Sequence, residues 1–195
     1  MTGRAVLALS DTLSAGSIVL QRRRPSDVPE VLAAVAVSIK QLSAFLRWAA
    51  AGVPSRSQFE RAVAERDAEF LAGTGFEYVL REFSTGRVVG EAGGELTLDR
   101  EAVTIGYWVR SDATGRGYAT AAARALTSLA FEVFPHIRRV EIRMDHGNVA
   151  SQAIAIRLGF VHIGQETFDD PPLSGQTGRG HIYAMTRDQW APSRD

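Results

Sequence analysis

The sequence contains no cysteine and only one lysine, Lys40. Without cysteine the chain can form no disulfide, no thiolate zinc site and no cysteine nucleophile. Any covalent intermediate in a group transfer would therefore have to form on serine or another oxygen nucleophile, unless the transfer is direct. Because a P-loop needs Gly-Lys followed by Ser or Thr, the single lysine also disfavours that phosphate-binding motif.

An excess of charge is also missing, since 22 basic residues balance 22 acidic ones. Nucleic-acid-binding domains carry a basic surplus, so we expect no nucleic-acid partner. The cluster Arg22-Arg23-Arg24 is more typical of a strand end than of a binding patch. No run of apolar residues approaches the roughly 18 to 20 that cross a membrane, and we recognise no targeting segment. We therefore expect no membrane partner and a cytoplasmic location.

The length of 195 residues, with 45% hydrophobic residues, suits one domain with a real core. The pattern predicts a loose leader over residues 1–15 and a single domain over 16–195. Within it, periodicity predicts seven strands and four helices in mixed order, an α+β or α/β architecture. The expected strands are 17–22, 76–83, 88–98, 102–109, 140–144, 160–168 and 181–186. The expected helices are 25–48 with a break near 38–43, 55–72, 115–134 and 148–158.

Two glycines, Gly115 and Gly117, stand where the strand 102–109 gives way to an alanine-rich helix. Unpartnered N–H groups and the helix dipole make such a turn a site for phosphate or pyrophosphate. A plain strand–turn–helix corner would use the same glycines, and a nucleotide-binding module is a further alternative. Thr120 occupies the place of the third glycine of a dinucleotide fingerprint, which disfavours that motif.

Two segments around this turn carry a family resemblance. Thr114-Gly-Arg-Gly-Tyr-Ala119 resembles the [QR]-x-x-G-x-[GA] pyrophosphate loop of the GNAT acetyltransferase superfamily, with Thr114 in place of the usual Gln or Arg. Asn148-Val-Ala-Ser151, followed by Leu158-Gly-Phe160, resembles the element that closes the same cofactor site. Together with Gly-Tyr-Trp-Val before the loop, they are similar to the RimJ/RimL branch, which acetylates ribosomal-protein N-termini. The resemblance covers roughly residues 17 to 190.

The resemblance implies a mixed, mostly antiparallel seven-stranded GNAT sheet flanked by about four helices. It implies acetyl-CoA as co-substrate, no metal, and direct transfer of acetyl to a primary amine of a protein N-terminus or a small molecule. A non-catalytic acyl-CoA-binding or regulatory relative is the alternative, and a homodimer is left open. The residues implied to bind CoA are Trp108, Val109, Thr114, Gly115, Arg116, Gly117, Tyr118, Ala119, Asn148 and Ser151.

For catalysis, the resemblance implies that Ser151 hydrogen-bonds or protonates the leaving thiolate. Many relatives place a tyrosine seven residues after the asparagine, where this chain has Ala155. The alternative is structural, with Asn148 acting as a helix N-cap and Ser151 as an ordinary helix-start residue. The side chains of Tyr107 and Trp108 are expected to be plain sheet residues.

The sequence identifies no general base. Many relatives have a glutamate just before the Ile-Gly-Tyr-Trp strand core, where this chain has Thr104. A water chain could also deprotonate an amine, so no single base is required. The loop from Asp169 to Gly180 carries acids that could attract a cationic amine, or it is an ordinary solvated loop. The spacings of His136, His146 and His162 fit no common metal motif. The candidates for a base are Glu91, Glu101, Glu166, Asp169 and His181.

Overall fold

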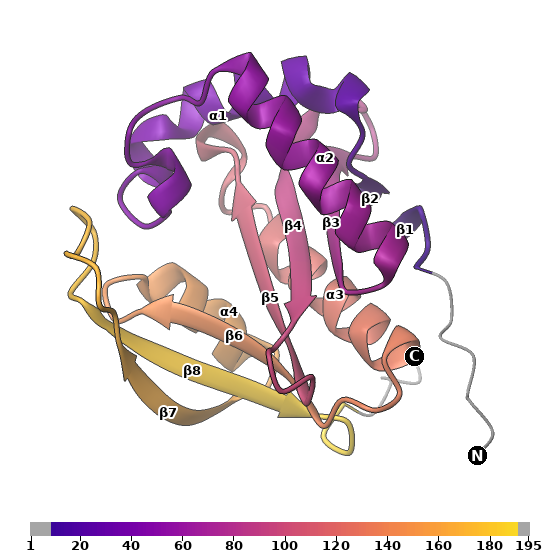
Figure 1. Cartoon of the computed structure of the whole chain (residues 1–195), viewed down its shortest axis with the longest axis vertical. Helices are drawn as coiled ribbons and strands as arrows, with labels where there is room; N and C mark the ends of the chain where they lie inside the picture. Colours follow the sequence, from indigo (N-terminus) through magenta and orange to yellow (C-terminus); the bar gives the residue numbers. More distant parts are fainter. Residues whose placement is uncertain (1–8, 191–195) are drawn as a thin grey trace.

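Eight strands form one sheet in the order β1-β2-β3-β4-β5-β6-β8-β7 in the computed structural model, which describes residues 9–190 (Figure 1). Neighbouring strands are antiparallel except β5 and β6, which are parallel. The strands are β1 (Thr12–Ala15), β2 (Ile18–Arg22), β3 (Gly75–Glu82), β4 (Val88–Leu96), β5 (Ala102–Val109), β6 (Arg139–Asp145), β7 (Val161–Thr167) and β8 (Arg179–Thr186). The α-helices are α1 (Val28–Leu42), α2 (Arg56–Ala72), α3 (Tyr118–Val133) and α4 (Val149–Arg157), and the short 3-10 helices are η1 (Pro25–Asp27), η2 (Arg47–Ala49) and η3 (Ser111–Ala113).

The mixed, mostly antiparallel α/β fold with four α-helices is confirmed, with eight strands in place of seven. The additional strand is β1, which lies where we expected the end of a loose leader. It pairs with β2 in the register Leu13–Leu20, across a turn in which Gly16 has a φ of 61°. A four-residue strand with two polar residues gives too short an alternation to be recognised from sequence. Residues 1–8 of the expected leader lie outside the described residues.

Helices cover both faces of the sheet and create two hydrophobic cores. Helices α1 and α2 pack on β4 and β3, and α3 packs on the opposite face, chiefly on β5. Helix α1 contributes Val28, Val31 and Val35, which recur at helical spacing and are fully buried. Helix α3 buries Ala122, Leu126 and Ala130 in the same manner. The β5 strand therefore has a helix layer on either side (Figure 1).

The only parallel pair of the described sheet opens after three residues. Strands β5 and β6 are in register at Ala102–Arg139, Val103–Val140 and Thr104–Glu141. Beyond this point β6 diverges from β5 (Figure 1), while β5 continues to pair with β4 up to Val109. The edge of β5 over residues 105–109 consequently has no strand beside it on the β6 side, and its backbone groups there border a gap.

Candidate active site

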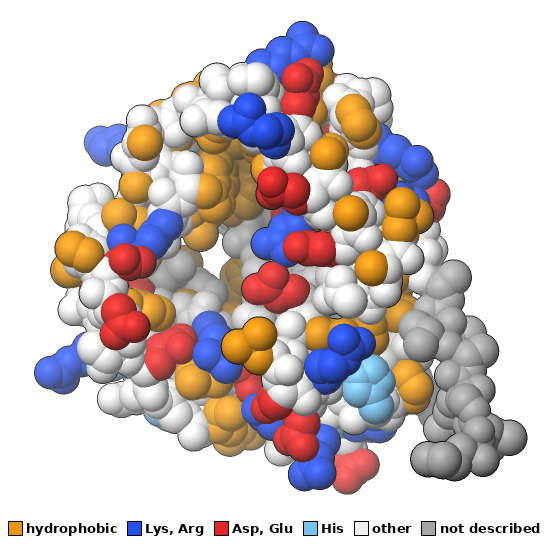
Figure 2. Space-filling model, viewed as in Figure 1, with side chains coloured by type: hydrophobic (Ala, Val, Ile, Leu, Met, Phe, Trp, Pro, Cys, Tyr) orange, Lys and Arg blue, Asp and Glu red, His pale blue; other side chains and the backbone are white. Residues whose placement is uncertain are grey.

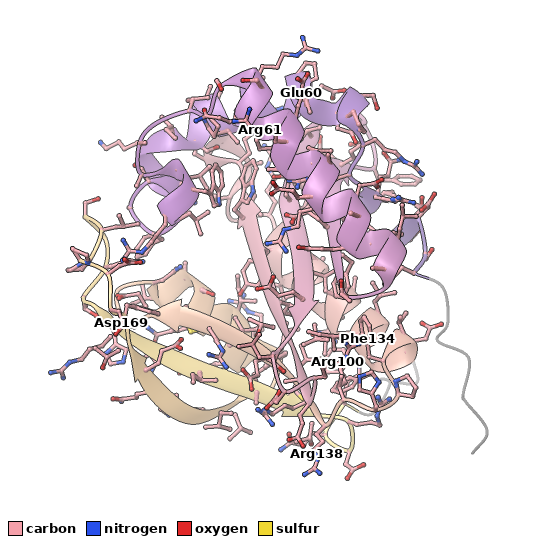
Figure 3. The ribbon with its side chains drawn as sticks, viewed as in Figure 1. Glu60, Arg61, Arg100, Phe134, Arg138 and Asp169 are labelled. Atoms are coloured by element: carbon pink, nitrogen blue, oxygen red, sulfur yellow. The ribbon has the colours of Figure 1, made fainter. Side chains whose placement is uncertain are left out.

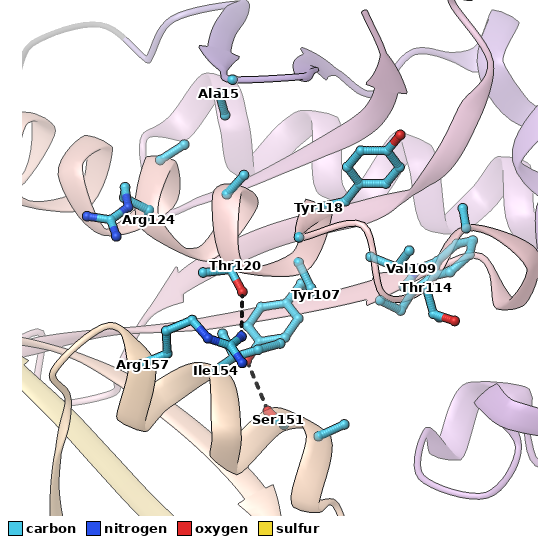
Figure 4. A pocket seen from close by; sticks show the side chains of 18 of the residues that line it. Ala15, Tyr107, Val109, Thr114, Tyr118, Thr120, Arg124, Ser151, Ile154 and Arg157 are labelled. Carbon is cyan, nitrogen blue, oxygen red and sulfur yellow. Dashed lines mark hydrogen bonds between the residues drawn. The ribbon is translucent and has the colours of Figure 1, made fainter.

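A cavity of about 1630 Å³ borders the end of β5 where its edge is unpaired. Its walls come from β1 and the turn after it, from the end of α1, from β5, from the turn before α3, and from the facing sides of α3 and α4. The space-filling view is hollowed between α1 and β6, with hydrophobic side chains in part of the wall (Figure 2). Figure 4 shows the wall formed by β5, α3 and α4 at close range. Of the predicted cofactor-binding residues, all except Arg116 line this cavity.

The glycine turn faces the cavity with a backbone that only glycine adopts readily. Gly115 and Gly117 have φ values of 78° and 80°, in the left-handed region. A Cβ built on either residue meets no atom within 4 Å, so a side chain there would project into open space. Helix α3 follows directly, and the N–H groups of its first turn have no partner within the helix. The turn thus presents backbone donors and a helix dipole to the cavity.

Helix α1 holds this turn in place. The hydroxyl of Ser38, which is fully buried, donates to the carbonyl of Ala34 and accepts from the N–H of Ser111 at 3.0 Å. The Ser111 hydroxyl in turn donates to the carbonyl of Val37. Thr114 donates its hydroxyl to the carbonyl of Ser111 at 3.2 Å. At the position where relatives carry Gln or Arg, Thr114 therefore stabilises the turn itself.

Arg116 points to the end of β3. Its guanidinium lies 3.2 Å from a carboxylate oxygen of Glu82, which also accepts from the hydroxyl of Tyr118. The basic side chains that line the cavity are instead Arg124 and Arg157. Arg157 donates to the hydroxyl of Thr120 at 3.3 Å (Figure 4). Sequence reasoning missed both arginines, although Arg124 follows Gly117 by two helical turns and so shares its side of α3.

Ser151 and Tyr107 form a hydroxyl pair in the cavity wall. Asn148 caps α4, because its side-chain oxygen accepts from the N–H of Ser151 at 3.2 Å. The hydroxyl of Ser151 lies 3.1 Å from that of Tyr107, which reaches it from β5 (Figure 4). Burial raises the pKa of Tyr107 to about 12, so the phenol keeps its proton at neutral pH. The pair can therefore donate a proton or a hydrogen bond into the cavity.

The hydroxyl of Tyr107 is a candidate functional group that the sequence did not indicate. We expected this side chain to be a plain sheet residue, whereas it lines the cavity. Ala155, at the position where many relatives have tyrosine, is fully buried and supplies no hydroxyl. Tyr107 comes from a strand 44 residues earlier in the chain, and no local spacing relates it to Ser151.

None of the five acids and bases proposed as candidates lines the cavity. Glu101 and Glu166 lie near Arg138 and Arg143, at 3.7 and 3.1 Å. Asp169 is exposed on the loop between β7 and β8. His181 belongs to a cluster in which its ring stacks on His146 and contacts His162. The spacing of the histidines in the sequence did not predict this cluster. Within residues 9–190, no group of three or more His, Cys, Asp or Glu side chains has the geometry to hold a metal ion.

Glu91 is buried beneath Trp108, one of the residues that line the cavity. Its carboxylate lies 3.1 Å from the Arg23 guanidinium and accepts from the indole N–H of Trp108 at 3.3 Å. Burial raises the pKa of Glu91 to about 7, against the opposing effect of Arg23. This carboxylate is therefore placed to hold Trp108 in the wall, and it does not itself face the cavity.

The raised pKa of Glu91 makes folding stability depend on pH. A carboxyl that is easier to protonate in the folded state stabilises the protein at low pH, and that contribution falls as pH rises towards about 7. We expect the free energy of unfolding of the wild type, minus that of Glu91→Gln, to decrease between about pH 4.5 and pH 7 in urea titrations. Glu60→Gln, an exposed change on α2, controls for the loss of one negative charge. A difference that grows with pH would refute this account of Glu91.

A protein-family model described as "Acetyltransferase (GNAT) domain" matches residues 17–161, which are about three quarters of the chain. The chain belongs to the GNAT acetyltransferase family. The enzyme class expected from the glycine turn and from the Asn148–Ser151 segment, with acetyl-CoA as acetyl donor, is thereby confirmed at the level of the family.

Individual relatives of this GNAT domain agree with the assignment. A segment of 86 residues is 34% identical to YdaF of Bacillus subtilis (strain 168), whose name describes it as a candidate ribosomal N-acetyltransferase. The segment covers 44% of this chain and spans 46% of the length of YdaF. Among solved structures, RimL, a ribosomal L7/L12 alpha-N-protein acetyltransferase in complex with CoA, aligns with a TM-score of 0.81 at 22% identity, covering 91% of this chain and 99% of RimL. The microcin C7 self-immunity acetyltransferase MccE, in complex with acetyl-CoA and AMP, aligns with a TM-score of 0.79 at 18% identity, covering 92% and 99%.

The described residues of the GNAT domain fit CoA as a ligand. The turn offers backbone donors for a diphosphate, and Arg124 and Arg157 add two positive charges to the same cavity. The unpaired edge of β5 offers alternating N–H and C=O groups to an amide-containing arm. Within residues 9–190, no helix is long and apolar enough to cross a membrane.

Proposed function

We propose that this protein transfers acetyl from acetyl-CoA directly to a primary amine, and that Ser151 assists the departure of the thiolate. The observation that carries the proposal is the Tyr107–Ser151 hydroxyl pair, 3.1 Å apart in the wall of a cavity that the glycine turn also lines. One end of such a site can hold the diphosphate while the other presents a proton donor to the sulfur. A chain that only stored acyl-CoA would need the first of these and not the second.

In the proposed step, the neutral amine attacks the thioester carbonyl carbon and the C–S bond breaks. The amine gives up one proton, and the sulfur leaves as a thiolate or takes a proton as it departs. A backbone N–H on the free edge of β5 can polarise the carbonyl oxygen. Ser151 hydrogen-bonds the sulfur, or protonates it and regains a proton from water, and Tyr107 holds the serine hydroxyl in position. None of the five candidate bases lines the cavity, and in the proposed step the amine proton leaves through water.

As the acceptor we propose the α-amino group of a protein, by analogy with RimL, a ribosomal L7/L12 alpha-N-protein acetyltransferase, and with YdaF, whose name describes a ribosomal N-acetyltransferase. A panel of matched peptides tests this choice. One peptide has a free N-terminus and no lysine, one is N-acetylated and has an internal lysine, and polyamines and amino acids complete the set. The proposal expects release of CoA thiol with the first peptide and little with the second. Turnover with the small amines alone would show that the acceptor is a small molecule and not a protein.

The loop between β7 and β8 supplies the acids that could attract a cationic acceptor. Asp170 lies 3.0 Å from Arg47, so part of its charge is already balanced. Asp169 is exposed, and no ion pair involves it within the described part of the chain (Figure 3). Of these two aspartates, Asp169 is therefore the more available to an incoming amine.

We expect Asp169→Asn to raise the KM for the acceptor and to leave CoA affinity unchanged. The effect should shrink as salt rises, because exposed charges are screened over about 10 Å at roughly 0.1 M. Glu60→Gln, which removes an acid from α2 on the far side of the molecule, is the matched control (Figure 3). If Asp169→Asn and the double change with Asp170→Asn both handle every amine like the wild type at low salt, the loop does not dock the acceptor.

Two alternatives have their own tests. A non-catalytic acyl-CoA-binding relative would bind acetyl-CoA and release no thiol with any amine. A nucleotide-binding module would bind ATP in preference to CoA, which calorimetry with both ligands decides. The cytoplasmic location and the oligomeric state stay predictions.

A further inference from the structure

The loop between β7 and β8, residues 168–178, spans the gap between two parts of the cavity wall; we call it the bridging loop. On one side it contacts the end of α1 and the segment after it. The N–H of Gly175 donates to the carbonyl of Ala44 at 3.1 Å, and the amide of Gln176 donates to the carbonyl of Phe45 at 3.1 Å. Arg47 donates to the carbonyl of Pro171 at 2.9 Å. Phe45 itself lines the cavity.

On its other side the bridging loop is bound to the turn that starts α4, through the carboxylate of Asp145. One carboxylate oxygen accepts from the N–H of Gly147 at 2.7 Å and from the N–H and hydroxyl of Thr177 at 2.8 and 3.1 Å. The other oxygen accepts from the N–H of Gly178 at 3.0 Å. Asp145 is only 4% exposed. Burial opposes its ionisation, but these hydrogen bonds outweigh that effect and lower its pKa.

Two glycines bring the same segments into close backbone contact. A Cβ on Gly147 would lie 2.3 Å from the carbonyl oxygen of Gly175. A Cβ on Gly175 would lie 2.8 Å from the ring of Phe45 and 3.0 Å from Ala44. Neither glycine has a positive φ, so close packing alone, and not an unusual backbone conformation, excludes a side chain at these positions. Gly175 is thus packed between the turn that precedes α4 and the segment that follows α1.

We propose that Asp145 is a positioning residue that couples the start of α4 to the bridging loop. Binding of CoA in the cavity then makes the bridging loop more rigid, and this loop carries the acids proposed to attract the acceptor. Asn148 and Ser151 lie within the first turn of α4, and Asn148 follows Asp145 by three residues. A ligand that orders this turn also orders Gly147, whose N–H shares the carboxylate with Thr177. The bridging loop then becomes more rigid without any ligand contact of its own. The coupling rests on the proposed binding of CoA in this cavity.

Hydrogen exchange of the wild-type protein, with and without saturating CoA, tests the coupling without any need for turnover. The N–H groups of Gly175, Thr177 and Gly178 all donate within this network, so their exchange reports its opening. We expect CoA to slow their exchange by at least about fivefold, the lower end of typical coupling between sites. Unchanged exchange at these three amides, with CoA demonstrably bound, would overturn the proposal.

Substitutions locate the coupling at Asp145. In Asp145→Ala, CoA should still bind, while its effect on exchange in the bridging loop should disappear. Asp145→Asn keeps one acceptor oxygen and should retain part of the effect. A merely structural role would lower protection equally with and without CoA, so it would leave the CoA-dependent difference intact.

Gly175→Ala provides a second route in case the Asp145 variants do not fold. It inserts one methyl group at the contact with Ala44 and Phe45, and it should raise the KM for the acceptor and weaken the effect of CoA on the loop. Gly164→Ala on β7 is the matched control, since a Cβ there meets nothing within 4 Å. Equal behaviour of the two variants would contradict the proposal. Failure of the wild type to bind CoA would instead refute the proposed function, so the two failures are distinguishable.

Discussion

Replacing Ser151 by alanine should lower kcat by about 10² to 10⁴-fold if the hydroxyl acts as general acid to the leaving thiolate. The KM for acetyl-CoA should change little, because the interaction with the sulfur strengthens only as the C–S bond breaks. A smaller loss would indicate that Ser151 only hydrogen-bonds the sulfur. Steady-state rates with a fixed acceptor, read out as released CoA thiol, measure the effect.

Two further variants make this result specific. Tyr107→Phe removes the partner hydroxyl at 3.1 Å and should reduce kcat less than Ser151→Ala does, since the acid itself remains. Ser128→Ala removes another cavity-lining serine hydroxyl, one that accepts from the indole N–H of Trp190. It should leave kcat near the wild-type value. If Ser151→Ala turns over like the wild type, Ser151 is only a helix-start residue and the proposed mechanism fails.

Gly117→Val should weaken CoA binding by at least about 1 to 3 kcal/mol, the scale of lost charge-assisted hydrogen bonds. The valine side chain would occupy the open space in front of the turn, and its β-branched form disfavours the φ of 80° that Gly117 adopts. Both effects displace the backbone donors from a diphosphate. Calorimetric titration with CoA gives the affinity directly.

The control for Gly117→Val has to carry the same backbone strain elsewhere. Gly86 has a φ of 70° in the hairpin between β3 and β4, and a Cβ there also meets nothing within 4 Å. Gly86→Val should therefore cost folding stability and leave CoA affinity unchanged. A folded Gly117→Val protein that binds CoA as tightly as the wild type would exclude the turn as the diphosphate site.

Most of the fold could be predicted from sequence because its signals are local. Ser55 as a helix N-cap and the apolar spacing of Val28, Val31 and Val35 each act within one element. Strand β1 escaped detection because four residues hold too little alternation and its stability depends on pairing with β2. The opening of β5 away from β6 depends on how distant segments pack, and no local pattern in the sequence signals it.

The candidate site divides in the same way. Gly115, Gly117, Asn148 and Ser151 could be named because each belongs to a short motif with a fixed spacing. Tyr107 could not be paired with Ser151 in advance, since 44 residues separate them. Arg116 was expected to bind CoA because it lies within the loop motif, but its guanidinium pairs with Glu82 on β3, and it does not line the cavity. Contacts between distant segments, including those of Asp145 with Thr177 and Gly178, had no signal in the sequence.

Quantitative transfer of a labelled acetyl group decides whether this cavity acetylates an amine. The protein is mixed with acetyl-CoA carrying an isotopically labelled acetyl group and with a peptide that has a free N-terminus. We predict one free CoA thiol for each labelled acetyl group found on the peptide amine, and slower formation of both products by Ser151→Ala. Tight binding of acetyl-CoA by the wild type, with no labelled product on this peptide or on any amine of the panel, would contradict the proposed acetyl transfer.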